Sequence, residues 1–464
     1  MNVAKIAALS FFCALCSTAN ANDYKSVEAV FAPQSKNQFV LDIEAALART
    51  QAQQGIIPEW AAAEITKKAS VRYAPLDKIA KEYKLVRHRM VALLNVWTRS
   101  MDKGAGEYVH FGTTTVDVYD TALVLQLKQA THILLADLRQ LELAMISLAE
   151  EHRDTIMVGR TRGQHALPIT FGKKVSTWLG ENRRNIERLQ EVLKRLEKSG
   201  ILKGAVGSYL GLGQQAMQTE AGFVAELGLQ KPYADDWHGS RDVLAEYALV
   251  LSLISKSYGR IGSELFLLQT TDIGETEEIM TKTAVGSSTM PHKKNPSKPE
   301  ALMFYARTIP RLAEVIVDDM VNTFERDDTS RTARSLAEIS IETEDMLDSA
   351  RRLIVNLKVK PEVMKANLEK TGGLIMAQRV TFALAGKIGK TTANAKMHDV
   401  AQYAIDNKLT LREALEHDTE LSQHLSAAEL DALFDATTYI GLAPQQVDAV
   451  IAEIRLKRQN DSKE

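Results

Sequence analysis

Long stretches of the chain repeat apolar residues at the spacing of an α-helix. Between residues 120 and 152, apolar side chains recur every three, four or seven positions with charged residues between them, namely Leu127, Leu134, Leu138, Leu141, Met145 and Leu148. Residues 173–198 and 243–269 follow the same pattern. Strand-like alternation is hard to find, and Asn-Gly and Asp-Gly hairpin turns are absent. The pattern predicts an all-α protein with few strands.

The placement of proline supports very long helices. No proline occurs between Pro75 and Pro168, between Pro168 and Pro232, or between Pro310 and Pro361. A proline inside a helix costs about 3 kcal/mol, so proline-free segments of this length permit long, uninterrupted helices. Long helices with few strands predict a helical bundle.

The chain length of 464 residues favours two or three domains. After a leader at residues 1–21, we expect a mixed helical N-terminal domain at 22–115 and a central long-helix bundle at 116–370. Following Thr371-Gly372-Gly373, residues 371–464 are expected to form a small helical C-terminal domain.

The N-terminus has the pattern of a secretory signal. A basic start ending at Lys5 precedes an apolar run at residues 6–18, and Ala19-Asn20-Ala21 fits the small-x-small cleavage rule. The apolar run is too short to span a bilayer. We expect cleavage after Ala21 and a periplasmic or secreted protein with no membrane attachment; the alternative is an N-terminal helix buried in the core.

Composition and cysteine usage narrow the function. A formal charge of −2 gives no reason to expect a nucleic acid or anionic membrane partner, and 45% hydrophobic with 25% charged residues is ordinary for a soluble protein. Both cysteines, Cys13 and Cys16, lie in the predicted leader. The mature chain would therefore lack disulfides, thiolate ligands and a cysteine nucleophile, and it has no His-x-x-x-His pattern near a carboxylate, so we expect no metal site.

The segment Gly286-Ser-Ser-Thr-Met-Pro-His-Lys-Lys-Asn-Pro296 carries the sharpest chemical signal. Small residues leave successive backbone amides free to surround an anion, and a lysine adds a positive charge. Such a loop suits a carboxylate and the negative charge that develops on it. By composition alone, the alternative is an exposed basic loop.

This segment resembles the Gly-Ser-Ser-x-Met-Pro-x-Lys-x-Asn signature of the fumarase/aspartase superfamily, which includes adenylosuccinate and argininosuccinate lyases. The resemblance implies that Ser287 is the general base, and that Ser288, Lys293 and Asn295 bind a small dicarboxylate substrate. It also implies that no cofactor is needed. The fold it implies is three-domain and all-α, with a central bundle that forms the core of a homotetramer and active sites built from several chains.

Two upstream segments extend the resemblance. His110-Phe-Gly-Thr-Thr-Thr-Val-Asp117 is similar to the family's His-x-Gly-x-Thr-Ser-x-Asp segment, with Thr115 in place of serine. The match implies that His110 lies in the site and that Thr114 and Thr115 bind substrate. His88 lies in a stretch that resembles the one where adenylosuccinate lyases carry another active-site histidine. The alternative for each histidine is a hydrogen-bonded core residue.

Further short matches follow in the family's order. Residues 204–208, Ser240-Arg241-Asp242 and Glu325-Arg326-Asp327 resemble pieces of the adenylosuccinate lyase branch. By that match, Arg241 and Arg326 are expected to bind substrate. Each match is weak alone, and their order and spacing make them strong together.

One segment departs from the family. In Gly159-Arg-Thr-Arg162-Gly-Gln164-His165, Arg162 replaces the histidine that adenylosuccinate lyases use as general acid or as its partner. A guanidinium does not release a proton near neutral pH, but it can hold a carboxylate in a two-pronged grip. Glu300 matches the glutamate that orients the missing histidine. An Arg162–Glu300 ion pair is therefore one expectation, and a substrate carboxylate held by Arg162, with Gln164 beside it, is the other.

Three functions remain open at this stage. The first is a lyase that forms fumarate by β-elimination, with the proton supplied by His165, His110 or His88, or not needed. The second is a 3-carboxy-cis,cis-muconate cycloisomerase, because those relatives also lack the histidine and carry Gln-His-Ala, as residues 164–166 do. The third is an exported pseudoenzyme that binds a dicarboxylate or a partner without turnover.

Overall fold

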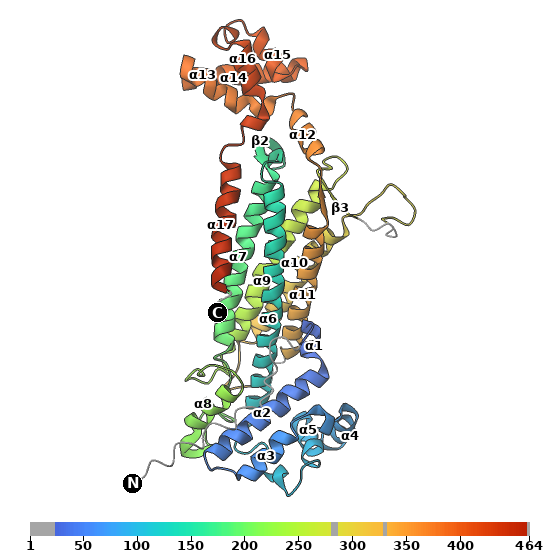
Figure 1. The fold of residues 1–464 in the computed structure, drawn as a ribbon, viewed down its shortest axis with the longest axis vertical. Helices are drawn as coiled ribbons and strands as arrows, with labels where there is room; N and C mark the ends of the chain where they lie inside the picture. The colour runs from blue at the N-terminus through green and yellow to red at the C-terminus, as the bar shows by residue number, and fades with distance from the viewer. Residues whose placement is uncertain (1–23, 280–285, 328–331, 462–464) are drawn as a thin grey trace, which may run out of the picture. The chain divides into compact units, whose positions relative to one another are not determined.

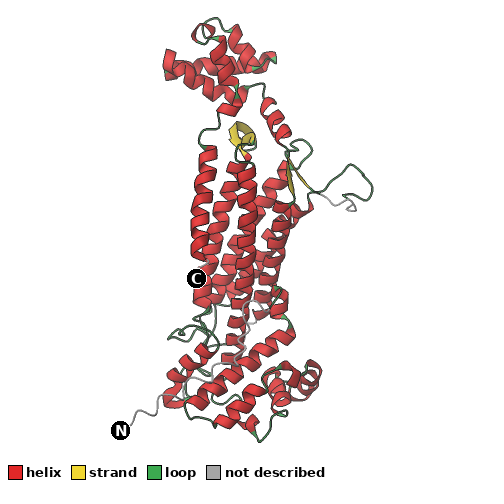
Figure 2. Ribbon diagram, viewed as in Figure 1, coloured by secondary structure: helices red, strands yellow, loops and turns green. Residues whose placement is uncertain are grey.

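The computed structural model describes residues 24–279, 286–327 and 332–461, and the predicted signal at 1–21 lies outside this part of the chain. Helices make up most of the described chain, and the few strands are short (Figure 2). The described residues contain 17 α-helices. The all-α prediction is confirmed.

The elements follow one another as labelled in Figure 1. Their bounds are α1 Val27–Phe31, α2 Pro33–Gln53, α3 Glu59–Lys67, α4 Leu76–Val86, α5 Arg89–Thr98, α6 Thr115–Glu151, β1 Ile156–Thr161, β2 Gln164–Thr170, α7 Phe171–Leu196, α8 Ala216–Glu226, α9 Asp242–Leu268, β3 Thr276–Glu278, α10 Ser297–Asp318, α11 Ala333–Val355, β4 Leu357–Val359, α12 Pro361–Glu369, α13 Ala377–Ile388, α14 Lys390–Asn407, α15 Leu411–His417, α16 Ala427–Phe434 and α17 Ala443–Asp461.

Each of the three segments with helical periodicity forms one long helix, as predicted. Helices α6, α7 and α9 have 37, 26 and 27 residues. The repeated apolar positions of α6 are buried, and five of the six have no exposed surface, namely Leu127, Leu134, Leu138, Leu141 and Met145. Burial of this stripe is what fixes the helix in place, because an isolated helix gains little from its own hydrogen bonds.

Proline proved a weaker marker of helix ends than expected, because Pro310 lies inside α10. A proline has no N–H for the carbonyl four residues earlier, here that of Ala306. That carbonyl instead accepts a hydrogen bond from Lys256 Nζ on α9 at 2.6 Å. A side chain therefore replaces the missing backbone donor.

The sequence analysis missed a β-hairpin in the segment that departs from the family. Strands β1 and β2 pair antiparallel from Ile156↔Thr170 to Thr161↔Gln164, and Arg162 and Gly163 are the two turn residues. Their φ angles are +53° and +78°, as a type I′ turn requires. The turn residues are Arg-Gly, and neither of the usual hairpin signals, Asn-Gly and Asp-Gly, marks it in the sequence. A second, shorter pair joins β3 to β4.

The chain forms two compact units, each made of three separate segments. Unit 1 contains the described residues within 1–137, 186–255 and 307–345, and unit 2 those within 138–185, 256–306 and 346–464. The domain boundaries predicted near 115 and 370 fall at the start of α6 and in the glycine-containing turn after α12. No helix of the described chain combines the length and apolarity needed to cross a bilayer.

Helices α13–α16 of unit 2 form a small helical cluster, which precedes α17 in the chain. Its core comprises Val380, Leu384, Met397, Leu411 and Leu415, all of them buried, together with their neighbours. Capping boxes begin α15 at Thr410 and α16 at Ser426, each with a glutamate at the third helical position. These caps define the helix starts where the apolar runs are too short to do so alone.

Candidate active site

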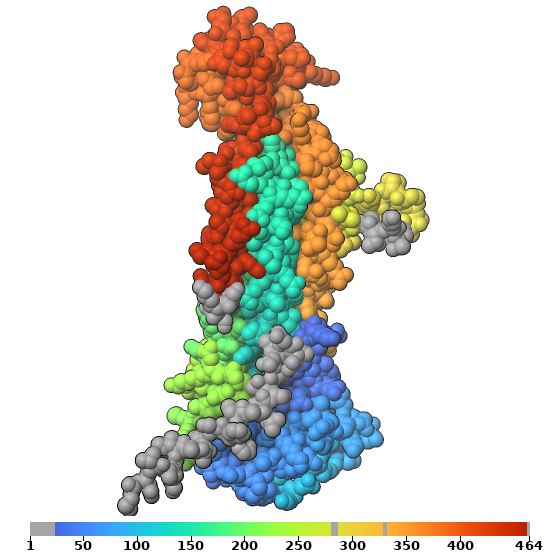
Figure 3. All heavy atoms as spheres, in the orientation of Figure 1, coloured from blue at the N-terminus to red at the C-terminus, as the bar shows by residue number. Residues whose placement is uncertain are grey.

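The signature loop, residues 286–296, projects from the helices of unit 2 (Figures 1 and 3). It closes on itself at Gly286, whose carbonyl accepts a hydrogen bond from Asn295 Nδ2 at 3.1 Å. A Cβ at Gly286 would lie 2.5 Å from the carbonyl oxygen of Lys293, so only glycine fits there. Asn295, predicted to bind substrate, thus also holds the two ends of the loop together.

Ser287 and Ser288 lie at the start of this loop. The backbone N–H of Met290 donates to Ser287 Oγ at 3.1 Å. A donor at this oxygen favours negative charge on it, which a serine acting as a base requires. Ser287 is half-buried and Ser288 is exposed.

The two lysines of the loop have different environments. Lys294 forms an ion pair with Glu277 of β3, which also pairs with Lys360 at 2.8 Å. Hydrogen bonds from these two lysines lower the pKa of Glu277 to about 2. Lys293 is exposed, and its side chain makes no ion pair or hydrogen bond with the described residues. Lys294 therefore anchors the loop, and Lys293 is the lysine available to an external anion.

Arg162 and Gln164 are exposed at the turn of the β1–β2 hairpin, and Glu300 is exposed in the first turn of α10. Within the described residues of the single chain, no ion pair joins Arg162 to Glu300. Arg162 is exposed, and its guanidinium pairs with no carboxylate of the described residues. The pair with Glu300 and the grip on a substrate carboxylate both stay predictions.

His165 follows the turn on β2. Burial, followed by the positive charge of Arg160, lowers the pKa of His165, and its Nδ1 is buried without a hydrogen-bond partner. Arg160 itself is held by the fully buried Glu275 at 2.6 and 3.0 Å. His165 is therefore neutral near pH 7, which suits a proton acceptor better than a proton donor.

His110 has the opposite character. Its Nδ1 lies 2.6 Å from Oε1 of Glu44 on α2, and its backbone N–H donates to Oε2 of the same carboxylate at 3.0 Å. Burial alone would lower the pKa of His110, but the hydrogen bond and charge of Glu44, with the charge of Asp117, raise it. With Nδ1 on the carboxylate, Nε2 makes no hydrogen bond with the described residues and can carry a transferable proton.

Thr114 and Thr115 begin helix α6, and a buried carboxylate fixes them. Asp117 Oδ2 accepts from the backbone N–H of Thr114 and from Oγ1 of Thr113, each at 3.1 Å. This is half of a capping box, with the acid at the third helical position. The hydroxyls of Thr114 and Thr115 make no hydrogen bond with the described residues, so they remain available to a substrate.

The other predicted residues of unit 1 differ in accessibility. His88 is exposed at the N-cap of α5, where its Nδ1 accepts from the N–H of Val91. Arg241 is buried, and its guanidinium donates to Asp120 at 3.1 and 3.4 Å. Arg326 is half-buried, and its Nη1 is buried without a partner.

The predicted residues therefore divide between the two units. Unit 1 contains His88, His110, Thr114, Thr115, Arg241 and Arg326, and unit 2 contains Arg162, Gln164, His165, Ser287, Ser288, Lys293, Asn295 and Glu300. Within unit 1, the Asp117 and Asp120 carboxylates connect the loop containing Thr114 to Arg241. Within unit 2, the hairpin and the signature loop are separate structures.

Comparison with known proteins places the chain in a family. A family model described as "Lyase" matches residues 24–310, and one described as "Adenylosuccinate lyase C-terminus" matches residues 373–450. The chain belongs to the fumarase/aspartase superfamily of lyases.

Individual members of this superfamily with different activities are similar over almost their whole length. The adenylosuccinate lyase of Methanocaldococcus jannaschii is 37% identical over 92% of this chain and 94% of its own. The N-acetyl-S-(2-succino)cysteine lyase of Dickeya dadantii is 36% identical over 92% and 93%. The structure of 3-carboxy-cis,cis-muconate lactonizing enzyme from Pseudomonas putida matches with a TM-score of 0.85 and 33% identity, covering 92% of this chain and 96% of that one.

Three residues that organise this fumarase/aspartase-type chain were not singled out from the sequence. Glu44 is the partner of His110, Asp120 is the partner of Arg241, and His238 contacts both Asp117 and Asp120. Each lies at least 66 positions from a residue it contacts. Nothing in a local motif signals such pairing, although an acid within an apolar helical stripe, such as Glu44, hints at a buried partner.

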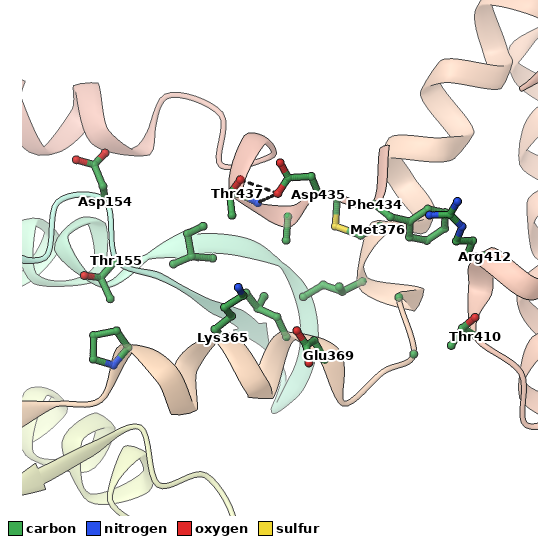
Figure 4. Close-up of a pocket in the computed structure, with 17 residues that line it drawn as sticks. Asp154, Thr155, Lys365, Glu369, Met376, Thr410, Arg412, Phe434, Asp435 and Thr437 are labelled. Carbon is green, nitrogen blue, oxygen red and sulfur yellow. Dashed lines mark hydrogen bonds between the residues drawn. The ribbon is translucent and has the colours of Figure 1, made fainter. Parts of the chain in front are cut away.

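A cavity of about 660 Å³ lies elsewhere in unit 2 (Figure 4). Thr155 beside the hairpin, Lys365 and Glu369 of α12, and Phe434 and Asp435 near α16 contribute to its lining. None of the predicted site residues of this lyase lines it. Across residues 24–279, 286–327 and 332–461, no group of three or more His, Cys, Asp or Glu side chains is placed to hold a metal ion.

The anchoring of the signature loop should depend on pH. Glu277 has a lowered pKa, so its ion pairs stabilise the fold above its ordinary pKa of 4.5 and this contribution is lost as the pH falls toward about 2. Replacing Glu277 with glutamine should lower the free energy of unfolding by about 1–2 kcal/mol near neutral pH. The loss should shrink as the pH falls to about 3.

Urea unfolding of the wild type and the Glu277→Gln variant at several pH values would measure this difference. Glu338→Gln, which removes an exposed pair with Arg334 on α11, is the matched control. An equal loss for Glu277→Gln at neutral and acid pH would contradict the assigned ion pairs.

Proposed function

We propose that the protein is a lyase that eliminates an amine, or a related leaving group such as a thiol, from a succinyl-type substrate and forms fumarate. The observation that carries the proposal is the signature loop, in which Ser287 Oγ receives a backbone donor while Lys293 is left unpaired. The names of the Methanocaldococcus and Dickeya relatives support a succinyl substrate with a nitrogen or sulfur leaving group.

In this mechanism Ser287, as the alkoxide, removes the proton from the carbon next to a substrate carboxylate. The electron pair moves into that carboxylate, giving an aci-carboxylate that Lys293 and the loop amides stabilise. The pair then forms the carbon–carbon double bond while the bond to the leaving group breaks. One proton has moved to Ser287, and the leaving group takes another from a general acid.

His110 is the best general acid among the three histidines considered. Its ring is paired with the buried Glu44, its pKa is raised, and its Nε2 is free of hydrogen bonds within the described chain. His165 has a lowered pKa, and His88 is exposed with Nδ1 used by the α5 N-cap. Arg162 would hold the second substrate carboxylate, since no carboxylate among the described residues pairs with its charge.

A cycloisomerase is the second candidate. Gln164-His165-Ala166 on β2 and the similarity to the Pseudomonas putida structure favour it. The same carboxylate-binding loop would serve either reaction, because a cycloisomerase closes a ring by adding a group across a double bond. Such an addition is the reverse of a β-elimination.

Formation of a fumarate adduct would test the lyase proposal. The purified protein would be mixed with fumarate and a panel of amines, nucleotides and thiols including N-acetylcysteine, and adducts identified by mass spectrometry. Ser287→Ala should lower the rate by a factor of about 10²–10⁴, as loss of a general base does. Thr289→Ala, an exposed position of the same loop, is the control and should retain activity.

Full activity in Ser287→Ala would overturn the mechanism. If no nucleophile gives an adduct, turnover of 3-carboxy-cis,cis-muconate would support the cycloisomerase instead. Binding of fumarate without either reaction would support the third alternative, a pseudoenzyme that binds a dicarboxylate without turnover.

The two loop lysines provide a matched comparison. Lys293→Met should raise the KM for fumarate about 10–100-fold, because a hydrogen bond to a charged group is lost. Lys294→Met, which removes only the pair with Glu277, should change KM by less than about fivefold. Steady-state kinetics on both variants would measure this, and Arg162→Met should behave like Lys293→Met. Equal effects for the two lysines would contradict the separate roles.

We further propose that the protein is exported and forms a homotetramer. Export is supported by the signal-like residues 1–21. Leu249, Leu253 and Leu267 are half-exposed and share one face of α9, which supports contact with another chain. We expect the mass of the protein from a periplasmic fraction to correspond to residues 22–464, and light scattering to give four chains. A full-length mass, or a monomer that retains full activity, would contradict the respective proposal.

A further inference from the structure

Four loops of unit 1 approach one another through glycines that have no room for a side chain. A Cβ at Gly112 would lie 2.7 Å from the carbonyl oxygen of Gly211, and a Cβ at Gly211 would lie 2.6 Å from that of Gly112. A Cβ at Gly207 would collide with the carboxylate of Asp236, and one at Gly239 would lie 2.8 Å from the carbonyl oxygen of Glu325. The loops at 110–114, 203–212, 236–241 and 323–327 therefore form one continuous assembly.

Asp117, in the first turn of α6, binds two of these loops. In addition to Thr113 and Thr114, it accepts from the backbone N–H groups of Lys203 and Gly204 at 3.0–3.2 Å. Its side chain has no exposed surface. A single buried carboxylate thus connects the loop that holds the predicted substrate-binding threonines to a loop about 90 residues further along the chain.

His238 adds the third loop. Its Nε2 lies 3.3 Å from Asp117 Oδ1 and its Nδ1 lies 2.7 Å from Asp120 Oδ2. Ionised carboxylates only accept hydrogen bonds, so a ring that bonds to one at each nitrogen must carry a proton on both. The residue is 2% exposed. His238 is therefore a buried imidazolium that bridges two carboxylates.

Further charged groups lie around the imidazolium. Arg241 donates to Asp120, and Asp236 accepts the backbone N–H of His238 at 3.2 Å. Burial alone would lower the pKa of His238, but the hydrogen bonds to Asp117 and Asp120 raise it to about 9. The same bonds and the charge of Arg241 hold the pKa of Asp120 below its usual range, against the effect of burial.

We propose that His238 is a positioning residue, which holds Asp117 in place and so fixes the Thr113–Thr114 loop and the Lys203–Gly204 loop relative to each other. Its ring bonds to Asp117 and Asp120, and it makes no hydrogen bond with the threonine hydroxyls. Its effect on catalysis passes through Asp117, which orients Thr114 at the start of α6. The catalytic part of this inference rests on the proposed function, and the structural part does not.

Hydrogen exchange measured by mass spectrometry on the intact protein tests the structural part. In His238→Gln, both N–H groups of the amide lie on one nitrogen and its other end is an acceptor, so the side chain cannot donate from both ring-nitrogen positions. Exchange should therefore quicken about tenfold or more in peptides covering both 110–118 and 203–209. Faster exchange confined to 236–242 would overturn the proposal.

Asp120→Asn is the matched control variant. It removes the second carboxylate but leaves the contact between His238 and Asp117, so peptides 110–118 and 203–209 should stay protected while 236–242 exchanges faster. Equal loosening of all three segments in both variants would indicate general destabilisation and would also overturn the proposal.

The wild type provides a test without any substitution. Raising the pH through about 9 removes the imidazolium proton, so protection at 110–118 and 203–209 should fall in that range after correction for intrinsic exchange. Protection that is unchanged up to about pH 10 would contradict a charged bridge.

Kinetics separate this inference from the proposed function. If fumarate adducts form, His238→Gln should raise the KM for fumarate about tenfold, with a smaller change in kcat, because the threonines lose their position. Lowered kcat at unchanged KM would overturn the positioning role. If no adduct forms with the wild type, the proposed function fails and the exchange result still decides whether His238 holds the loops.

Discussion

The carboxylate of Asp117 is fully buried, so its lone pairs must find donors inside the protein. Five groups supply them: Oγ1 of Thr113, three backbone N–H groups and the ring of His238. The start of the 37-residue helix α6 and two distant loops are thereby fixed to one point. Removal of any one donor would leave the buried charge with fewer hydrogen bonds. The positions of the three segments that supply the donors are therefore constrained together.

A second constraint divides neighbouring basic residues into structural and available ones. Lys294 is held by Glu277 and Arg160 by Glu275, whereas Lys293 and Arg162 have no acidic partner in the described chain. Lys293 and Lys294 are adjacent in the sequence, and Arg160 and Arg162 are two positions apart. Arg160 lies within strand β1, whereas Arg162 lies in the turn that follows it, with a φ of +53°. Each segment therefore has one basic residue in an ion pair and one without an acidic partner among the described residues. In the proposed function, the unpaired residues bind the substrate carboxylates while the paired ones stabilise the fold.

The histidine that adenylosuccinate lyases carry at position 162 is absent, and the hairpin explains how an arginine is accommodated. Residue 162 occupies the first position of a two-residue turn with φ of +53° and points into solvent. The exposed side chain of an arginine there meets no desolvation cost within the chain. In the proposed mechanism, proton donation falls to a different histidine, His110, which is paired with Glu44. The proposed proton donor and the proposed carboxylate-binding arginine then belong to separate segments, which is compatible with relatives that catalyse different reactions on one fold.

The sequence by itself determined the long helices, the family and the reactive loop, because these depend on local signals. Helical periodicity in α6, α7 and α9 reports burial of one face, and the eleven residues from Gly286 to Pro296 are contiguous. Tertiary structure alone decided the ionic partners. Glu44, Asp120 and His238 act on residues 66 to 121 positions away, and no local pattern encodes a contact over that distance. It also placed Arg162 in an exposed hairpin turn that the sequence pattern did not predict. Local motifs therefore identify the side chains that carry the chemistry, whereas long-range packing determines their partners and their charge states.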